Sequence, residues 1–187
     1  MSVSTNDFKN GMTLDLDGVL FQIIEFQHVK PGKGGAFVRT KLKNVLTGQV
    51  LDRTFRAGDK VNETRLARRP VQFSYSDGHH YYFMEHETYE MIPLAGEVIG
   101  RDQLPYLKEG MECEGLVHDG DVISVDLPNF VELAVVETEP GVRGDTAQGA
   151  TKPARLETGA VVQVPLFVTP GERIKVDTRS GEYLSRA

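Results

Sequence analysis

Tryptophan is absent from this chain of 187 residues, and cysteine occurs once, at Cys113. A single thiol cannot form an internal disulfide, which indicates a reducing compartment such as the cytoplasm. No stretch approaches the roughly 20 apolar residues that are needed to span a membrane. Residues 1–10 also lack the hydrophobic segment of a secretory signal. We therefore expect a cytoplasmic protein with no membrane contact.

Positive charge is in deficit, with 21 Lys and Arg against 27 Asp and Glu, but it is unevenly distributed. Residues 1–64 hold nine basic and seven acidic side chains, residues 65–127 hold five and twelve, and residues 128–187 hold seven and eight. Each phosphate contact with a nucleic acid requires a local cation. We expect such contacts from the first third of the chain, whereas the middle third should avoid phosphate or face another partner.

Long helical periodicity is missing, and short alternating runs separated by turn residues predict an all-β chain of small barrels or sandwiches. Residues 101–108 are the best candidate for a short helical turn, although Pro105 limits its length. Residues 138–152 form a loop long enough to suggest a function. Two boundaries, near residues 65 and 128, divide the chain into three units, and the last two have similar lengths and turn spacing. Tight turns are expected at Asp17-Gly18, Thr47-Gly48, Asp77-Gly78, Asp119-Gly120 and Ser180-Gly181.

A basic, glycine-rich loop is the most informative local feature. Residues 28–43 carry five positive charges and no negative one. Within this run, Lys33 should stand at the tip of a hairpin, where the neighbouring residues are small or turn-forming: Lys30, Pro31, Gly32, Gly34 and Gly35. On composition alone, such a loop is more often a solvated hairpin tip without a function than a functional arm. The alternative is an arm that enters an RNA cavity or carries a covalent modification.

The strand that follows this loop has two unlike rows of side chains. A period of two places alternate residues on opposite faces of a strand. One face is expected to hold Ala36, Val38, Thr40 and Leu42. The other face is expected to hold Phe37 with a basic row, Arg39, Lys41 and Lys43.

The motifs that would indicate an enzyme or a metal site are incomplete. The Lys33 loop lacks the spacing and the Ser or Thr of a phosphate-binding loop. It also lacks an acid or base that would prepare Lys33 for Schiff-base chemistry. His79 and His80 should point to opposite faces of a strand, and His86 has no His-Glu-x-x-His partner. Carboxylates beside Cys113 should raise the pKa of its thiol. We therefore expect no catalytic residue, no metal and no cofactor.

Residues in the last third carry a family pattern. Lys152-Pro153-Ala154 is followed by Gly159, an aliphatic residue, Val-Pro, a second aliphatic residue and Gly171, at Val162, Val164-Pro165 and Val168. Residues 141–146, 175–178 and 181–183 extend the match, and residues 31–34 match the family's modified tip. On these residues the chain resembles bacterial elongation factor P over essentially its whole length.

The resemblance implies three small β-barrels in an L shape similar to tRNA. Residues 1–64 would form an SH3-like, KOW-like barrel that carries the Lys33 loop. Residues 65–127 would form a central OB-fold, and residues 128–187 a C-terminal OB-fold.

The resemblance also implies a function. Members of the family bind the 70S ribosome between the peptidyl-tRNA and exit sites and stimulate peptide-bond formation at consecutive prolines. By position, Lys33 would reach the CCA end of peptidyl-tRNA, and a lysine-modifying enzyme could extend it. The basic row would contact RNA. A loop of the third domain would approach the mRNA codon in the exit site, through Arg143, Gly144, Asp145 and Thr146. We expect a monomer without enzymatic activity.

Other interpretations of the sequence remain open. A paralogous factor of related fold could lack the activity on stalled ribosomes. A general single-strand RNA-binding protein would suit OB-folds, but it needs a basic, aromatic groove, and the middle third is strongly acidic. An enzyme that uses Lys33 as a nucleophile would form a trappable adduct with a carbonyl substrate.

Overall fold

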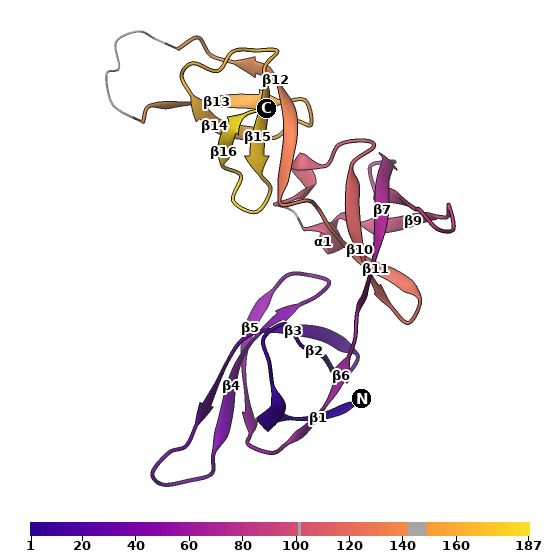
Figure 1. Ribbon diagram of the computed structural model, residues 1–187, viewed down its shortest axis with the longest axis vertical. Helices are drawn as coiled ribbons and strands as arrows, with labels where there is room; N and C mark the ends of the chain where they lie inside the picture. Colours follow the sequence, from indigo (N-terminus) through magenta and orange to yellow (C-terminus); the bar gives the residue numbers. More distant parts are fainter. Residues whose placement is uncertain (101, 142–148) are drawn as a thin grey trace. The chain divides into compact units, whose positions relative to one another are not determined.

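Strands dominate the protein, as the sequence predicts. A computed structural model describes residues 1–100, 102–141 and 149–187 (Figure 1). Its strands form three sheets, which confirms the all-β prediction. Grouped by internal contacts, the chain has two compact units, one of residues 1–69 with 115–125 and one of residues 70–114 with 126–187.

Helical structure is limited to short turns in the described residues: η1 (Thr5–Asp7), α1 (Gly96–Ile99) and η2 (Leu104–Tyr106). The turn η2 falls inside the predicted helical segment, whereas α1 was not predicted. None of the helices in the described part of the chain is long and apolar enough to cross a membrane.

The first sheet is antiparallel and has the strand order β1-β6-β2-β3-β4-β5. Its strands are β1 (Ser2–Ser4), β2 (Thr13–Leu16), β3 (Val19–Val29), β4 (Phe37–Asn44), β5 (Val50–Arg56) and β6 (Lys60–Thr64). Asp17 and Gly18 join β2 to β3 with φ of 55° and 84°. Two positive φ angles are the requirement of the tight hairpin turn that Asp-Gly predicts.

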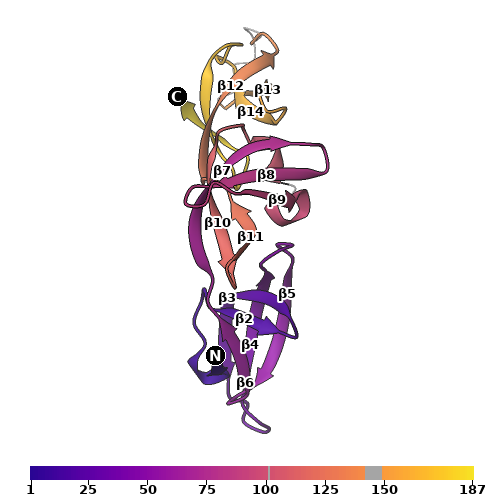
Figure 2. The ribbon, with the colours of Figure 1, turned by 90° about the vertical axis from the view of Figure 1, so that its right-hand side faces the viewer.

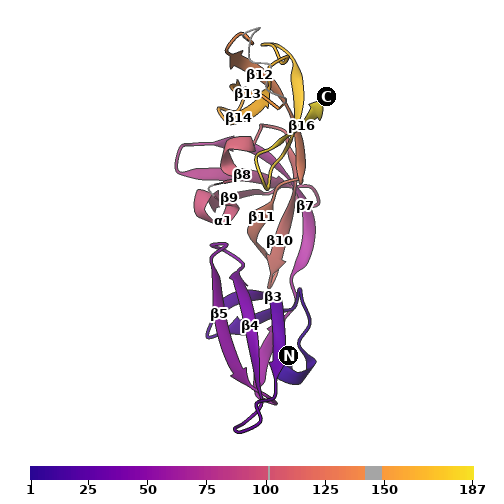
Figure 3. The same ribbon diagram turned by 90° about the vertical axis from the view of Figure 1, so that its left-hand side faces the viewer.

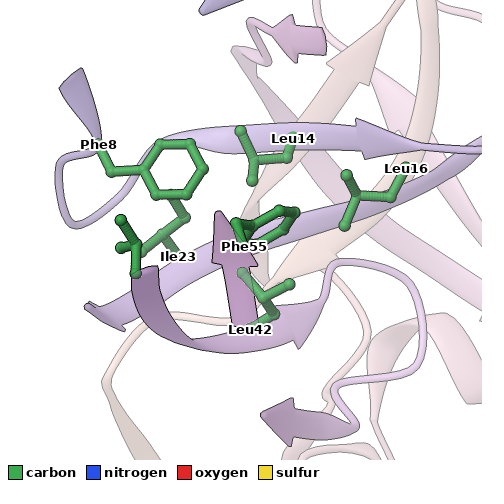
Figure 4. Packing of buried hydrophobic residues seen from close by; sticks show 7 residues of the cluster. Phe8, Leu14, Leu16, Ile23, Leu42 and Phe55 are labelled. Carbon is green, nitrogen blue, oxygen red and sulfur yellow. The ribbon is translucent and has the colours of Figure 1, made fainter. Parts of the chain in front are cut away.

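Alternating side chains of these strands build the first core. Val38 and Leu42 of β4 are fully buried, while the residues between them alternate as predicted. They pack with Leu14, Ile23 and Phe55 in one cluster (Figure 4). The rings of Phe8 and Phe55 meet edge to face, with their centroids 5.6 Å apart. This core supports β3 and β4 beneath the loop that joins them.

The second sheet has the order β11-β10-β7-β8-β9. Its strands are β7 (Ala67–Ser76), β8 (His80–Glu85), β9 (Met91–Ala95), β10 (Glu112–His118) and β11 (Asp121–Asp126). Strands β7, β8 and β9 follow one another across it (Figure 2). The prediction that His79 lies in a strand is wrong, because His79 belongs to the turn before β8. His86 likewise lies in the turn after β8.

The third sheet has the order β14-β13-β12-β15-β16 (Figure 3). Its strands are β12 (Phe130–Thr138), β13 (Thr151–Leu156), β14 (Val161–Pro165), β15 (Arg173–Asp177) and β16 (Tyr183–Arg186). Strand β13 was not predicted, and it takes in Lys152, which we had expected in the loop. The rest of the predicted loop is described only in part, since residues 142–148 lie outside the described part of the chain.

Candidate functional site

The Lys33 loop connects the two longest neighbouring strands of the first sheet. The antiparallel β3–β4 ladder runs from Phe21 opposite Asn44 to Val29 opposite Phe37, with an irregularity between Ile23 and Glu25. Residues 30–36 then leave the sheet as the connecting loop. Figures 2 and 3 show that this loop projects beyond the ends of its strands. The ladder therefore provides a firm base for an extended tip.

Lys33 lies exposed in that loop, as the sequence predicts. Within the described residues, its side chain has no hydrogen bond or ion pair to another residue. A Cβ added at Gly32 or Gly35 would meet no atom within 4 Å, so there is open space around the tip. Gly34 has a φ of +111°, a conformation that side-chain-bearing residues rarely adopt. The ammonium of Lys33 is thus available to an external partner.

The predicted basic row is present on the outer face of β4. Arg39, Lys41 and Lys43 are exposed, whereas the intervening Thr40 and Leu42 are buried. The hydroxyl of Thr40 donates a hydrogen bond to the carbonyl of Arg53 on β5, at 2.7 Å. A buried polar side chain is thereby satisfied, and the alternation of the strand is maintained.

The three cations of the basic row have different surroundings. Lys41 Nζ lies 3.5 Å from Glu25 Oε2, and Asp52 is the residue directly opposite Lys41 on β5. The guanidinium carbon of Arg39 lies 5.8 Å from the centre of the Phe37 ring. Neither Arg39 nor Lys43 has an ion pair within the described residues.

A shallow pocket of about 150 Å³ opens among these strands, lined by Glu25, Phe26, Gln27, Arg39, Thr40, Lys41 and Asp52. Sequence reasoning placed Phe37 and the basic row on this surface but did not identify Glu25 or Asp52 as part of it. Their positions follow from the register between three strands. The irregularity in β3 shifts its register against β4, so counting by twos from the sequence does not find Glu25, and Asp52 is found only from the pairing of β5 with β4.

The second predicted contact region, Arg143 to Thr146, lies outside the described residues. The described residues beside it are firmly placed. Lys152 is buried, and its ammonium donates a hydrogen bond to the carbonyl of Glu139 at 2.6 Å. The hydroxyl of Thr138 donates to the carbonyl of Pro153 at 2.9 Å. These two bonds tie the end of β12 to the start of β13.

The histidines and the cysteine do not form a shared centre. His86 Nε2 lies 2.6 Å from Glu112 Oε2, at the surface. Cys113 is buried, and burial together with the charge of Glu112 raises the pKa of its thiol to about 12. The direction matches the prediction, although burial is the larger cause. No cluster of three or more His, Cys, Asp and Glu side chains suited to a metal ion occurs in residues 1–100, 102–141 and 149–187.

Three family models match successive parts of the chain. The elongation factor P KOW-like domain matches residues 4–61, the elongation factor P OB domain matches residues 66–125, and the elongation factor P C-terminal domain matches residues 131–186. The chain belongs to the elongation factor P family. Its members are translation elongation factors, and the predicted KOW-like and OB folds are confirmed.

Relatives named "Elongation factor P" match from end to end. The chain is 56% identical to the protein of Moorella thermoacetica over 99% of this chain and 100% of the relative. It is 59% identical to that of Symbiobacterium thermophilum over the same shares, and 55% identical to that of Synechococcus elongatus over 98% and 99%. Among solved structures, a eukaryotic translation initiation factor 5A from Methanococcus jannaschii aligns with a TM-score of 0.54 at 25% identity. That alignment covers 68% of this chain and 92% of the other.

Proposed function

We propose that the protein binds the ribosome between the peptidyl-tRNA and exit sites, in the cytoplasm, and stimulates peptide-bond formation at consecutive prolines without itself catalysing a reaction. Lys33 is the residue that acts, by positioning the CCA end of peptidyl-tRNA. The observation that carries the proposal is the exposed ammonium of Lys33, without a partner in the described residues, at the tip of a loop that has open space around it.

Positioning is a sufficient role for this side chain. Proline reacts slowly in peptide transfer because its ring constrains the attacking geometry. A factor that orders the tRNA end reduces the entropy lost on reaching a reactive arrangement. An ammonium group donates up to three hydrogen bonds and binds phosphate or ribose oxygens with charge assistance. The ribosome supplies the bond-forming chemistry, so Lys33 exchanges no proton.

The loop also suits a modifying enzyme. Because no atom lies within 4 Å of a Cβ built at Gly32 or Gly35, an enzyme can approach the backbone on both sides of Lys33. A covalent extension of the amine would lengthen a side chain whose own reach is about 6 Å. We propose that such an extension, made by a dedicated enzyme, adjusts the contact with the tRNA end.

Two further contacts complete the proposal. Arg39 and Lys43 on the outer face of β4 would bind RNA phosphates near the tip. The segment of Arg143, Gly144, Asp145 and Thr146 would approach the exit-site codon of the mRNA, as the family resemblance implies.

The direct test is a reconstituted translation assay on a message with consecutive proline codons. Lys33→Ala should fold normally and bind ribosomes but lose the stimulation of proline–proline bond formation. Lys9→Ala, which removes another exposed lysine of the same barrel, should retain it. Equal stimulation by Lys33→Ala and the parent protein would overturn the proposed role of the tip.

A further inference from the structure

The segment of residues 70–100 contains no Lys or Arg, and it holds four of the six tyrosines of the chain. It has five carboxylates in the same stretch: Asp77, Glu85, Glu87, Glu90 and Glu97. Strands β7, β8 and β9 form most of this segment. Its composition differs from that of the basic hairpin, which indicates a different kind of partner.

Within residues 70–100, the outer face of β7, β8 and β9 carries no formally charged residue. In the register of the sheet, Tyr75 lies opposite Tyr82 and Tyr82 opposite Pro93, while Met84 lies opposite Met91. The same face is completed by Gln72, His80 and Ala95. Tyr75 is 50% exposed and Met91 is 41% exposed. The residues between them, such as Phe73 and Phe83, point into the core.

Two tyrosines form the centre of this outer face. The rings of Tyr75 and Tyr82 are stacked, with their centroids 4.5 Å apart and their planes at 12°. The ring centroids of His80 and Tyr82 are 6.4 Å apart, and their planes meet at 63°. The hydroxyl of Tyr82 donates a hydrogen bond to Asp77 Oδ2 at 3.0 Å. A stacked and tethered pair presents a fixed aromatic surface, so little side-chain entropy is lost when a partner binds.

The turn at the end of β7 holds the carboxylate of Asp77 beside this pair. Asp77 Oδ1 accepts hydrogen bonds from the backbone N–H groups of His79 and His80, at 2.8 and 2.7 Å. These backbone bonds are the main reason that the pKa of Asp77 is lowered to about 2. The carboxylate therefore stays ionised at physiological pH, next to the aromatic surface.

The charge of the segment decides which class of partner fits. A nucleobase could stack on Tyr75, but its phosphates would be repelled by Asp77 and would meet no Lys or Arg within residues 70–100. The arginines of β7, Arg68 and Arg69, lie six or more residues from Tyr75, roughly 20 Å along the strand. An aromatic and methionine-containing centre with the carboxylate of Asp77 at its edge instead complements a basic protein surface.

We infer that the outer face of β7, β8 and β9 is a docking site for a basic protein segment, in which an arginine stacks on Tyr75 and pairs with Asp77. A guanidinium is planar and weakly hydrated, so it stacks on an aromatic ring and binds a carboxylate at the same time. This inference rests on the proposed function in one respect: the segment is placed on a ribosomal protein.

The test uses the full-length protein with the photoreactive residue p-benzoylphenylalanine in place of Tyr75, bound to purified 70S ribosomes. We expect a crosslink to a ribosomal protein, at a peptide that contains arginine. The same residue placed at Tyr89, which is 73% exposed but lies in the turn before β9, should give a much weaker crosslink. A crosslink to ribosomal RNA, or none while the protein co-sediments with ribosomes, would overturn the inference.

A second measurement is independent of the ribosome. A nine-residue peptide with three arginines is titrated into the protein while the ring signals of Tyr75 and Tyr82 are followed by NMR. We expect these signals to shift, less with a lysine version of the peptide and not with a glutamate version. Tyr75→Ala or Asp77→Asn should weaken binding about tenfold, as for the removal of a central contact. Tyr89→Ala should leave it unchanged.

The two experiments separate the two claims. If the parent protein does not co-sediment with ribosomes, the proposed function fails, and the peptide titration still decides the nature of the tyrosine face. If the protein binds ribosomes but the arginine peptide shifts no tyrosine signal, only the docking site is contradicted.

Discussion

Lys41 Nζ lies 3.5 Å from Glu25 Oε2, so one of the three cations on the outer face of β4 has its own counterion. Asp52 stands on the opposite side of Lys41, across the β4–β5 ladder. A phosphate that approached Lys41 would be repelled by both carboxylates. The basic row is therefore uneven, although its three members alternate regularly in the sequence.

This unevenness predicts different effects of single substitutions on ribosome binding. Arg39→Ala or Lys43→Ala should weaken binding and lower its dependence on salt, because each removes a cation that can contact phosphate. Lys41→Ala should change binding less. Affinity would be measured by sedimentation at several salt concentrations, with Lys9→Ala as the control. Equal losses for all three variants would contradict the assignment, as would unchanged affinity at every ionic strength.

Thr5 is expected to be a structural anchor of the first barrel. It is fully buried, its hydroxyl donates to the carbonyl of Arg56 at 2.9 Å, and it accepts from the N–H of Gly58 at 3.0 Å. Thr5→Val keeps the shape but leaves both backbone groups without this partner. The free energy of unfolding should fall by about 1–3 kcal/mol in a urea titration. Thr54→Val on exposed β5 should change it by less than about 0.5 kcal/mol.

The thiol of Cys113 should be unreactive in the folded protein. Burial, with a smaller contribution from Glu112, raises the pKa of its thiol to about 12, so the reactive thiolate is scarce. A thiol reagent at pH 8 should label the native protein far more slowly than the protein in urea.

The same shift has a consequence for stability at high pH. The unfolded thiol ionises near its ordinary pKa of 9.0, whereas the folded thiol stays protonated until about 12. The contribution of this group to stability is therefore complete below pH 9 and declines between these two values. Cys113→Ala should reduce this alkaline loss relative to the parent. For the labelling experiment, rapid reaction of the native protein with the thiol reagent would contradict the prediction, because it would show that the thiol is accessible.

Local chemistry made several parts of the fold predictable. Asp17 and Asp119 both take positive φ, at 55° and 50°, in the Asp-Gly turns that the sequence indicates. The buried and exposed rows of β4 alternate as its sequence predicts, because one face of this strand packs on a core and the other faces solvent.

Long-range pairing set the limit of that prediction. Strand β1 forms by pairing Ser2 with Asn62, sixty positions away, which leaves no local signal in three residues. The sequence predicts Lys152 in a loop, but it lies buried in β13. Its burial is possible because its ammonium donates a hydrogen bond to the carbonyl of Glu139. In the candidate site, Lys33 and the basic row were predictable from composition and period. The carboxylates beside Lys41 were not, since Glu25 and Asp52 come from two other strands.

The most direct measurement of the central claim locates the tip of the loop on the ribosome. Gly32→Cys is suitable, because a Cβ at this position meets no atom within 4 Å, and the buried Cys113 should escape labelling. An iron chelate attached at position 32 generates hydroxyl radicals that cleave nearby RNA. With peptidyl-tRNA bound, we expect cleavage at its CCA end, and no such cleavage from Val161→Cys in β14. Cleavage from position 32 at sites away from the CCA end would contradict the proposed role of Lys33.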